Sequence, residues 1–339
     1  RFKNRNVTDL DVIELEQALK KLTANALSRL DKDTSSINEL TKRFELLNKN
    51  DLNATDKVYQ LIEDCRIFGT LAFSHAARAG FVAVTMLKSL VKTGCLSHER
   101  MLEFQASIPT VASEFQSTLA DHNISTDDLI KQFGHLRPGT YDINQSTYWE
   151  NISFYFVRGK QQRLAKDECE YAFAFTPREL QGLREVLKQL PVKLEVDDFI
   201  EYMRKAIQAR ERVKFNFTRN ISVALDLMIY YGMETLGLTR EDVGFLTFDD
   251  IRAIRTGQLS ERLLPEFVKL RKADFSEQQL AKLPCFISRD EDFFGFEQQR
   301  SEANFITRLK IVADLVFIKS DQSKAIKSKI IVIPNADPG

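Results

Sequence analysis

The chain has 339 residues with 48 basic and 48 acidic side chains, so its formal net charge is zero. Apolar residues make up 43% of it, which is typical of a globular protein and excludes a wholly disordered or collagen-like chain. Zero net charge provides no overall field that would attract nucleic acid or an anionic membrane, so we expect neither as a partner. Glycine and proline are scarce, which favours long uninterrupted helices.

The first 50 residues predict two helices. Apolar residues recur at steps of three and four over residues 9–30 and again over residues 37–47. Thr8 is a suitable N-cap for the first helix. The polar stretch at residues 48–55 then breaks the pattern. We therefore predict that residues 1–50 form an N-terminal helical hairpin packed on the rest of the chain.

The same periodicity predicts a series of helices up to residue 190. They cover residues 56–68, 72–92, a stretch from residue 97, and residues 109–121, 125–133 and 176–190. The second of these is apolar nearly all round, as expected of a central buried helix. Thr176, Pro177 and Glu179 form a strong helix start, and Pro191 ends that helix. Residues 153–157 are a short apolar run that we expect to be extended.

Residues 197–236 form the longest periodic stretch. It contains no proline and predicts one helix of roughly 35 residues, straight or kinked. Shorter helices follow, capped by Thr239 and Thr247, and another begins at Ser260. After Pro284 the pattern changes to short strands, at residues 285–287, 293–296 and 329–333, with residues 311–318 fitting either strand or helix.

We thus expect a mainly α fold: an irregular multi-helix domain with long central helices and a small β element near the C-terminus. The predicted organisation is a helical hairpin at 1–50, a helical domain at 51–283, and short strands at 284–339. The chain opens with Arg1 and ends at Gly339 without the look of natural termini, which indicates a fragment of a longer polypeptide. No apolar run approaches the roughly 20 residues that cross a bilayer.

The four cysteines indicate a reducing compartment. Cys65, Cys95, Cys169 and Cys285 are too few and too scattered for a disulfide framework, and none has the spacing of a zinc site. We expect reduced, mostly buried thiols in a cytoplasmic protein that has no metal site in this segment.

The best local signal for a binding site is at residues 133–142, Phe-Gly-His-Leu-Arg-Pro-Gly-Thr-Tyr-Asp. Pro138 and Gly139 suit a type II turn, which would hold His135, Arg137 and Asp142 close together. Arg137 could then bind a phosphate or a carboxylate, and His135 could exchange a proton near neutral pH. The alternative is a structural turn in which Asp142 pairs with Arg137.

Other polar residues give weaker signals. Arg78 could reach a pocket or an interface, although an ordinary ion pair explains it equally well. His75 lies in an apolar helix and is better explained as a satisfied core histidine. The basic residues between 204 and 219 suggest either a solvated helix face or a stripe that binds anions or docks a domain. Asp249 and Asp250 are adjacent and do not share a helix face, so no acid/base pair is indicated.

Four segments resemble the central region of phosphoenolpyruvate-utilising phosphotransferases, the family of phosphoenolpyruvate synthase-like enzymes and rifampin phosphotransferase. They are the loop at 133–142, the long helix around Ala209-Arg210-Glu211, the segment from Arg240 to Ile251, and the stretch from Ile330 to Gly339. Each segment is weak by itself, but all four occur in the order of the family.

The resemblance implies how such an enzyme would work. An ATP-grasp domain binds ATP with Mg²⁺, a mobile domain carries a phosphohistidine, and a helical region between them holds the acceptor. This chain would be that region, with His135, Arg137, Asp142 and Arg78 as candidate contacts to an unidentified small-molecule phosphate acceptor. It contains neither a threonine-x-x-serine-histidine motif nor a glycine-rich phosphate loop, so we expect no catalysis and no cofactor in this segment alone.

The sequence leaves a second interpretation open. The chain could be a non-catalytic helical scaffold or a partner-binding module whose loop at 134–142 is purely structural. A concave pocket lined by the polar residues of that loop would favour the phosphotransferase. A filled core in which Asp142 is locked onto Arg137 would favour the scaffold.

Overall fold

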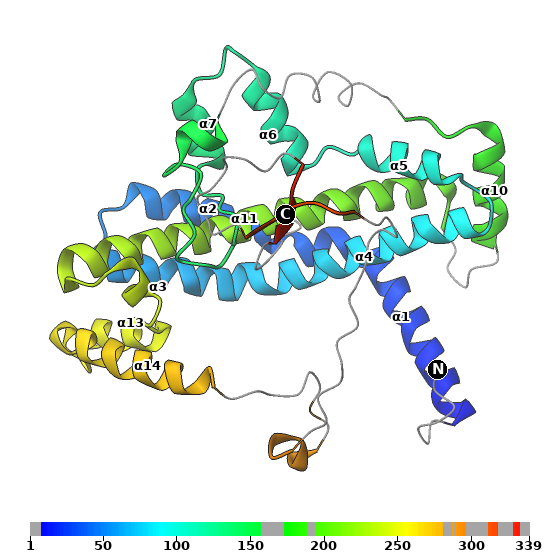
Figure 1. The fold of residues 1–339 in the computed structure, drawn as a ribbon. Coiled ribbons are helices and arrows are strands. Elements are labelled where there is room, and N and C mark those ends of the chain that lie inside the picture. The colour runs from blue at the N-terminus through cyan, green and yellow to red at the C-terminus, as the bar shows by residue number, and fades with distance from the viewer. Residues whose placement is uncertain are drawn as a thin grey trace. The chain divides into compact units, whose positions relative to one another are not determined.

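The computed structural model describes residues 8–156, 173–188, 194–280, 287, 289–295, 311–317 and 328–332. The chain divides into two compact units, Arg1–Pro265 and Glu266–Gly339. Helices make up most of the described residues (Figure 1), which confirms the mainly α fold. The domain boundaries expected at residues 50 and 283 stay predictions.

The helices of the first unit follow the predicted order. They are α1 (Asp9–Thr34), α2 (Ser36–Lys49), α3 (Ala54–Asp64), the π-helix η1 (Cys65–Gly69), α4 (Thr70–Lys92), α5 (His98–Ala106), α6 (Val111–Ala120), α7 (Thr126–Phe133), α8 (Ile152–Tyr155), α10 (Pro177–Lys188), α11 (Val196–Leu236), α12 (Arg240–Val243), α13 (Phe248–Arg255) and the 3₁₀ helix η2 (Glu261–Leu263). The next helix, α14 (Leu264–Gln278), begins at the end of this unit.

Side-chain caps begin many of these helices where the sequence predicts them. Thr8 and Thr247 each form a capping box, at the start of α1 and of α13. At α10, the Thr176 N–H donates to Glu179 Oε2 (2.7 Å) and the Glu179 N–H donates to Thr176 Oγ1 (3.3 Å). These bonds satisfy N–H groups that the first turn of a helix leaves without partners. Local sequence alone is therefore enough to place these ends.

The first two helices pack on the rest of the unit. α1 lies against α4, whereas α2 lies against η1, α3 and α11. Ser35 joins them with helical backbone angles (φ −60°, ψ −30°), so the chain passes directly from one helix into the next.

Helices α3, η1 and α4 run on as one segment, although the sequence places Gly69 between two helices. Gly69 closes the π-helix, where an added Cβ would lie 2.6 Å from Cδ2 of Phe217 on α11. The glycine therefore permits close packing and does not end a helix. This segment, Ala54–Lys92, is also the one stretch of described helix with the length and apolar composition to cross a membrane, a test that buried core helices also pass.

The central element is α11, which runs along α4 (Figure 1). Its 41 residues give a length of about 60 Å at 1.5 Å per residue. It ends at Gly237, which adopts a left-handed conformation (φ 66°) and whose N–H bonds the carbonyl of Gly232. The single long helix predicted from residues 197–236 is confirmed.

Four clusters of buried apolar side chains surround α11. One joins its N-terminal half to α4, α5 and α10, and a second joins its C-terminal half to α3, α12 and α13. A third packs its middle against α2, η1 and α4. The fourth joins α6 and α7, and Phe215 of α11 packs against it. These clusters make α11 a rigid support for the loop that follows α7.

The second unit contains two short strands. β1 (Leu315–Phe317) and β2 (Ile330–Val332) pair in parallel, with Leu315 opposite Ile330. The small β element near the C-terminus is therefore confirmed. The unit also contains the 3₁₀ helix η3 (Asp290–Phe293).

Several local expectations are wrong or lie outside the described residues. Residues 153–155 are helical and not extended, because they belong to α8, where Tyr155 stacks on Tyr148 at 3.9 Å between ring centroids. α6 begins at Val111 after the N-cap Thr110, so Pro109 precedes the helix. Phe293 ends η3 and is not in a strand. Cys285, Phe286 and Phe296 lie outside the described residues.

Candidate functional site

The loop at 134–150 folds back on itself after α7. The Tyr148 N–H donates to the Leu136 carbonyl (2.7 Å), and the Trp149 N–H donates to the Gly134 carbonyl (3.1 Å). These two bonds bring the end of the loop beside its beginning. The segment between them is therefore held at both ends before any side chain contributes.

The turn inside this loop differs from the predicted one. Gly139 does not have the positive φ that a type II turn requires at this position. Instead, the Asp142 N–H donates to the Gly139 carbonyl at 2.8 Å. A Cβ on Gly139 would lie 3.0 Å from Cβ of Asp142 and 3.1 Å from Cγ of Gln145. A larger residue would therefore crowd these two side chains, and glycine suits this close approach.

Arg137 is buried, with 1% of its side chain exposed. Its Nε donates to Ser222 Oγ (3.1 Å), and Nη2 donates to the Ser222 carbonyl (3.3 Å) and to Asp226 Oδ1 (2.6 Å). Its Nη1 donates to the carbonyls of Asp142 (3.3 Å) and Gln145 (3.4 Å). A guanidinium has five N–H donors, and each has an acceptor here. None is left for a ligand.

The carboxylate that pairs with Arg137 is Asp226, on α11. It also accepts a hydrogen bond from Trp149 Nε1 at 3.3 Å. Burial raises the pKa of the Asp226 carboxyl, and the Arg137 guanidinium opposes that rise. Asp142 was the predicted partner, but its carboxylate oxygen Oδ1 instead accepts a hydrogen bond from the backbone N–H of Asn144 (2.9 Å). The predicted Arg137–Asp142 ion pair is therefore wrong.

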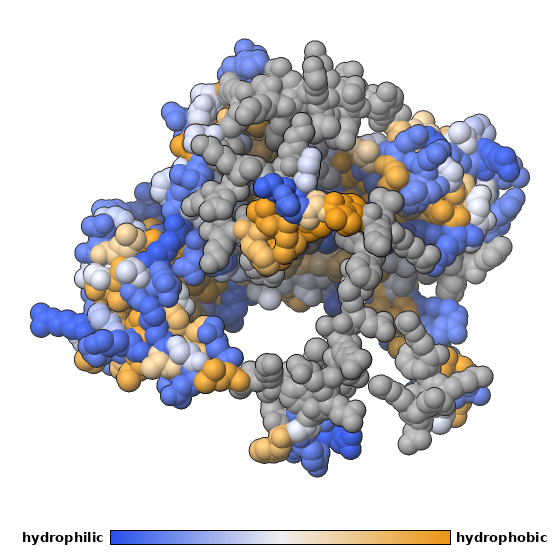
Figure 2. All heavy atoms as spheres, viewed as in Figure 1, coloured by the Kyte–Doolittle hydropathy of each residue, from blue (hydrophilic) through white to orange (hydrophobic). Residues whose placement is uncertain are grey.

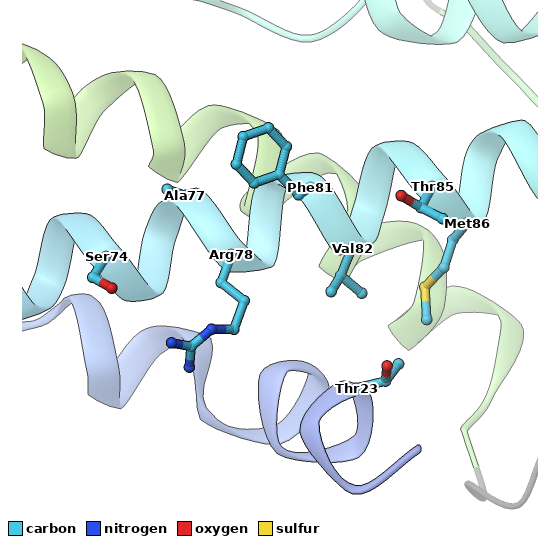
Figure 3. Close-up of a pocket in the computed structure, with 8 residues that line it drawn as sticks. All are labelled: Thr23, Ser74, Ala77, Arg78, Phe81, Val82, Thr85 and Met86. Carbon is cyan, nitrogen blue, oxygen red and sulfur yellow. The ribbon is translucent and has the colours of Figure 1, made fainter. Parts of the chain in front are cut away.

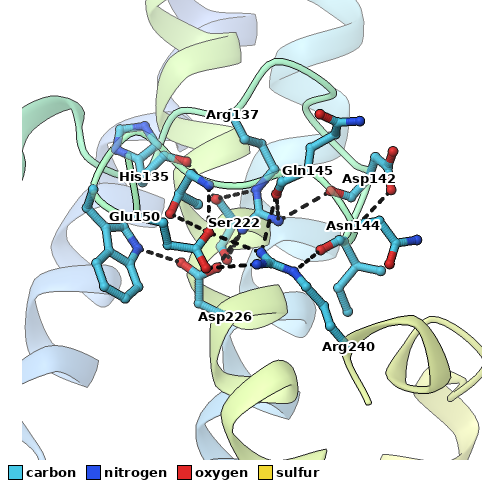
Figure 4. A network of polar contacts seen from close by, with 12 residues as sticks. His135, Arg137, Asp142, Asn144, Gln145, Glu150, Ser222, Asp226 and Arg240 are labelled. Atoms are coloured by element: carbon cyan, nitrogen blue, oxygen red, sulfur yellow. Dashed lines mark hydrogen bonds and ion pairs between the residues drawn. The ribbon is translucent and has the colours of Figure 1, made fainter. Parts of the chain in front are cut away.

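A second arginine ties the same loop to α12. Arg240 makes two hydrogen bonds to the Glu150 carboxylate (2.8 and 3.1 Å) and one to the Ile143 carbonyl (2.7 Å). Burial disfavours ionisation of Glu150, but its bonds with Arg240 and Thr147 prevail and lower its pKa. Figure 4 shows both arginines converging on the loop. The loop clamp, as we name this network, consists of Arg137, Trp149, Glu150, Ser222, Asp226 and Arg240.

His135 is buried beneath the loop clamp. Its ring packs edge-on against Phe215 at 4.6 Å between centroids, and its carbonyl accepts from Ser222 Oγ at 2.6 Å. Burial, reinforced by the charges of Arg219 and Arg137, lowers the pKa of His135 to about 3. Its Nε2 has no hydrogen-bond partner. The ring is neutral at pH 7, so the expected proton exchange near neutral pH does not fit this position.

The structure thus places His135, Arg137 and Asp142 together, as predicted, but through residues that the sequence analysis missed. These are Ser222, Asp226, Glu150 and Arg240. Asp226 had a usable signal: it is the one acidic residue in an apolar run of α11, residues 221–233. A lone carboxylate in such a run needs a buried partner. Nothing in the local pattern says which arginine that partner is.

Arg78, the fourth candidate, lies in a different place. It lines an open groove of about 540 Å³ between α1 and α4. The groove is lined by Thr23, Ser74, Ala77, Arg78, Phe81, Val82, Thr85 and Met86. Figure 3 shows the side chains of Arg78, Val82 and Met86 directed toward α1. The exposed Arg78 guanidinium makes no hydrogen bond or ion pair with another described residue. We call this feature the α1–α4 groove.

His75 has a polar partner on α1. His75 Nδ1 lies 3.2 Å from Asp33 Oδ2 on α1. It has a protein partner, as the core interpretation required, but its side chain is 24% exposed. The contact helps to hold α1 on α4.

No protein-family model matches the sequence, and neither does any curated protein or solved structure. Within the described ranges, no three His, Cys, Asp or Glu side chains are grouped so as to hold a metal ion. The loop clamp and the α1–α4 groove are the two features of the described residues that bear on function.

Proposed function

We propose that this chain is a rigid helical binding scaffold, in which the loop clamp is structural and the α1–α4 groove takes the ligand. One observation supports a structural role for the loop clamp: all five N–H donors of Arg137 are bound by protein acceptors. A ligand-binding arginine needs free donors directed into a cavity. Arg137 would have to leave Asp226 unpaired in order to bind an anion.

The proposal that the α1–α4 groove binds the ligand rests on the residues that line it. Its volume of about 540 Å³ lies within the range of small-molecule sites. Apolar side chains such as Phe81 and Met86 supply contact area, whereas Arg78 supplies a cation that no other described residue pairs with. Such sites typically combine an apolar surface with a few polar groups that fix orientation. The ligand class that fits is a small amphiphilic anion, with an aromatic or aliphatic body and one acidic group.

The test uses 8-anilinonaphthalene-1-sulfonate, an aromatic sulfonate whose fluorescence rises on binding. Arg78→Ala should weaken its binding by about tenfold, the effect of losing one charge-assisted hydrogen bond. Lys88→Ala is the matched control, because Lys88 is exposed on the same helix but does not line the groove. Equal binding by wild type, Arg78→Ala and a groove-filling Ala77→Trp variant would refute the groove as the ligand site.

The phosphotransferase is the second candidate. It is favoured by the four segments in family order and by the exposed charge of Arg78, which could contact a phosphate acceptor. In this proposal the chain holds the acceptor, while ATP, Mg²⁺ and the phosphohistidine domain belong to other parts of the polypeptide. The acceptor would bind at Arg78 and not at Arg137, because Arg137 has no donor to offer.

A kinetic experiment on the full-length polypeptide tests this candidate. With ATP and Mg²⁺ present, Arg78→Ala should raise the KM for the acceptor and leave kcat largely unchanged, as expected for loss of a binding contact. Lys88→Ala again serves as the control. Absence of any ATP-dependent phosphotransfer by the wild-type polypeptide would exclude the phosphotransferase but would leave the scaffold proposal intact.

A further inference from the structure

The N-terminal half of α1 carries apolar side chains that the rest of the described chain leaves uncovered. Every residue from 8 to 22 is exposed, and partial burial begins only at Thr23. Leu15, Leu19 and Leu22 are 49%, 54% and 46% exposed. Figure 1 shows this half of α1 projecting beyond α4, and Figure 2 shows apolar side chains among hydrophilic ones there. Leucines grouped in this way mark an interaction surface.

These side chains form a single row. Val12, Leu15, Leu19 and Leu22 follow one another at steps of three, four and three residues. That spacing is the heptad pattern of a helix that pairs with another helix. Leu10 is exposed too, but it lies off this row. We call Val12, Leu15, Leu19 and Leu22 the α1 seam.

The seam is complementary to itself when two copies run in opposite directions. If Leu15 of one helix lies opposite Leu19 of a second copy, the same register places Val12 opposite Leu22. The two reciprocal pairs then form by symmetry. An arrangement of this kind is closed by a two-fold axis, as in most homodimers.

The charges select the antiparallel direction. The acidic residues come first on this segment and the basic ones follow: Asp9, Asp11, Glu14 and Glu16, then Lys20 and Lys21. An antiparallel pair places the acidic part of one copy beside the lysines of the other. A parallel pair would instead place Asp11 of one copy beside Glu16 of the other, where like charges repel.

We propose that the α1 seam pairs two copies of this chain as an antiparallel helix dimer. The existing Glu16–Lys20 ion pair within one helix (2.7 Å) does not prevent this, because exposed pairs contribute little and rearrange easily. Four pairs of facing side chains make a small interface, so we expect a weak dimer whose population depends on protein concentration. The proposal is independent of the ligand in the α1–α4 groove.

The first test is sedimentation equilibrium of the whole chain over a range of concentrations. Wild type should show a monomer–dimer equilibrium, and the Leu15→Glu, Leu19→Glu double variant should be monomeric. Because both leucines are exposed, the substitutions should leave the fold intact, which circular dichroism checks. Leu10→Glu is the matched control, and it should dimerise like wild type. A monomeric wild type at the highest concentration would overturn the proposal.

A second test separates a second copy from any other partner. Lys20→Glu, Lys21→Glu makes the segment uniformly acidic, and Glu14→Lys, Glu16→Lys makes its centre basic. Each double variant should dimerise more weakly than wild type, because its own copies repel. An equimolar mixture of the two should recover association. Failure of the mixture to associate would refute the antiparallel pairing.

Discussion

The Arg137 guanidinium and the Asp226 carboxylate meet at 2.6 Å although 89 residues separate them in the chain. The contact joins a loop to the C-terminal half of α11. Because the Arg137 side chain is 1% exposed, its charge depends on protein partners for compensation. This relationship makes the loop part of the folded core.

Removing Arg137 should therefore destabilise the protein strongly. We expect Arg137→Ala to lower the free energy of unfolding by about 3–5 kcal/mol, since it removes the cation that pairs with the half-buried Asp226 and one donor from each of three carbonyls. Arg137→Lys should recover only part of the loss, because an ammonium cannot reproduce the planar fork. Urea unfolding followed by fluorescence of Trp149, the single tryptophan, measures both.

Arg252→Ala is the control for that experiment. Arg252 pairs with Asp249 at 3.0 Å on the surface, with both side chains mostly exposed. Such pairs contribute about 0–1 kcal/mol. If Arg137→Ala proved no more destabilising than Arg252→Ala, the clamp would not be structural.

His135 should make stability depend on pH. Its pKa is about 3 in the folded protein and 6.5 as the ordinary value, so the unfolded chain binds more protons between these pH values. The neutral His135 therefore contributes its full share of stability above about pH 6.5. As the pH is lowered toward 3, this group reduces the free energy of unfolding by at most about 1.4 kcal/mol per pH unit. His135→Phe should remove this part of the slope.

The comparison isolates His135, because the carboxylates titrate alike in both proteins. Unfolding free energies at several pH values between 4 and 7 provide the two slopes. Phenylalanine retains the packing against Phe215 and leaves the backbone bond to Ser222 in place. Parallel curves for wild type and His135→Phe would show that the folded protein protonates this histidine.

Gly69→Ala should be destabilising despite the higher helix propensity of alanine. Its Cβ would lie 2.6 Å from Phe217 and 3.2 Å from Leu40, both within the core, and such overpacking costs about 1–3 kcal/mol. Gly182→Ala on α10 is the matched control, because its Cβ would come closer than 3.4 Å to one atom alone, the terminal Sγ of Cys95 at 3.0 Å. Thermal unfolding should show a lower Tm for the first variant and little change for the second.

Cys65 should resist thiol reagents in the folded protein. It is 2% exposed, and burial raises the pKa of its thiol to about 12, so almost no thiolate exists at pH 8. In a Cys95→Ser, Cys169→Ser, Cys285→Ser variant, the remaining thiol should react with 5,5′-dithiobis(2-nitrobenzoate) only after unfolding. Rapid reaction of the folded variant would show that Cys65 is accessible.

Much of the helical architecture is readable from the sequence, because its signals are local. Thr8, Thr176 and Thr247 cap helices through residues three positions away, and local spacing is sufficient to find such contacts. The unbroken length of α11 follows from its periodicity and its lack of proline. The π-helix could not be predicted in this way, because Gly69 at its end packs closely against Phe217, which is far away in the sequence.

The candidate site divides in the same way. The sequence by itself determined that the helical pattern breaks from residue 134 onward and that His135, Arg137 and Asp142 lie near one another. Only the tertiary structure decided that Asp226 holds Arg137, that His135 is buried and neutral, and that Arg78 faces a groove elsewhere. The reason is physical: burial and long-range pairing depend on which helices pack together, and these determine whether a polar side chain serves a ligand or the fold.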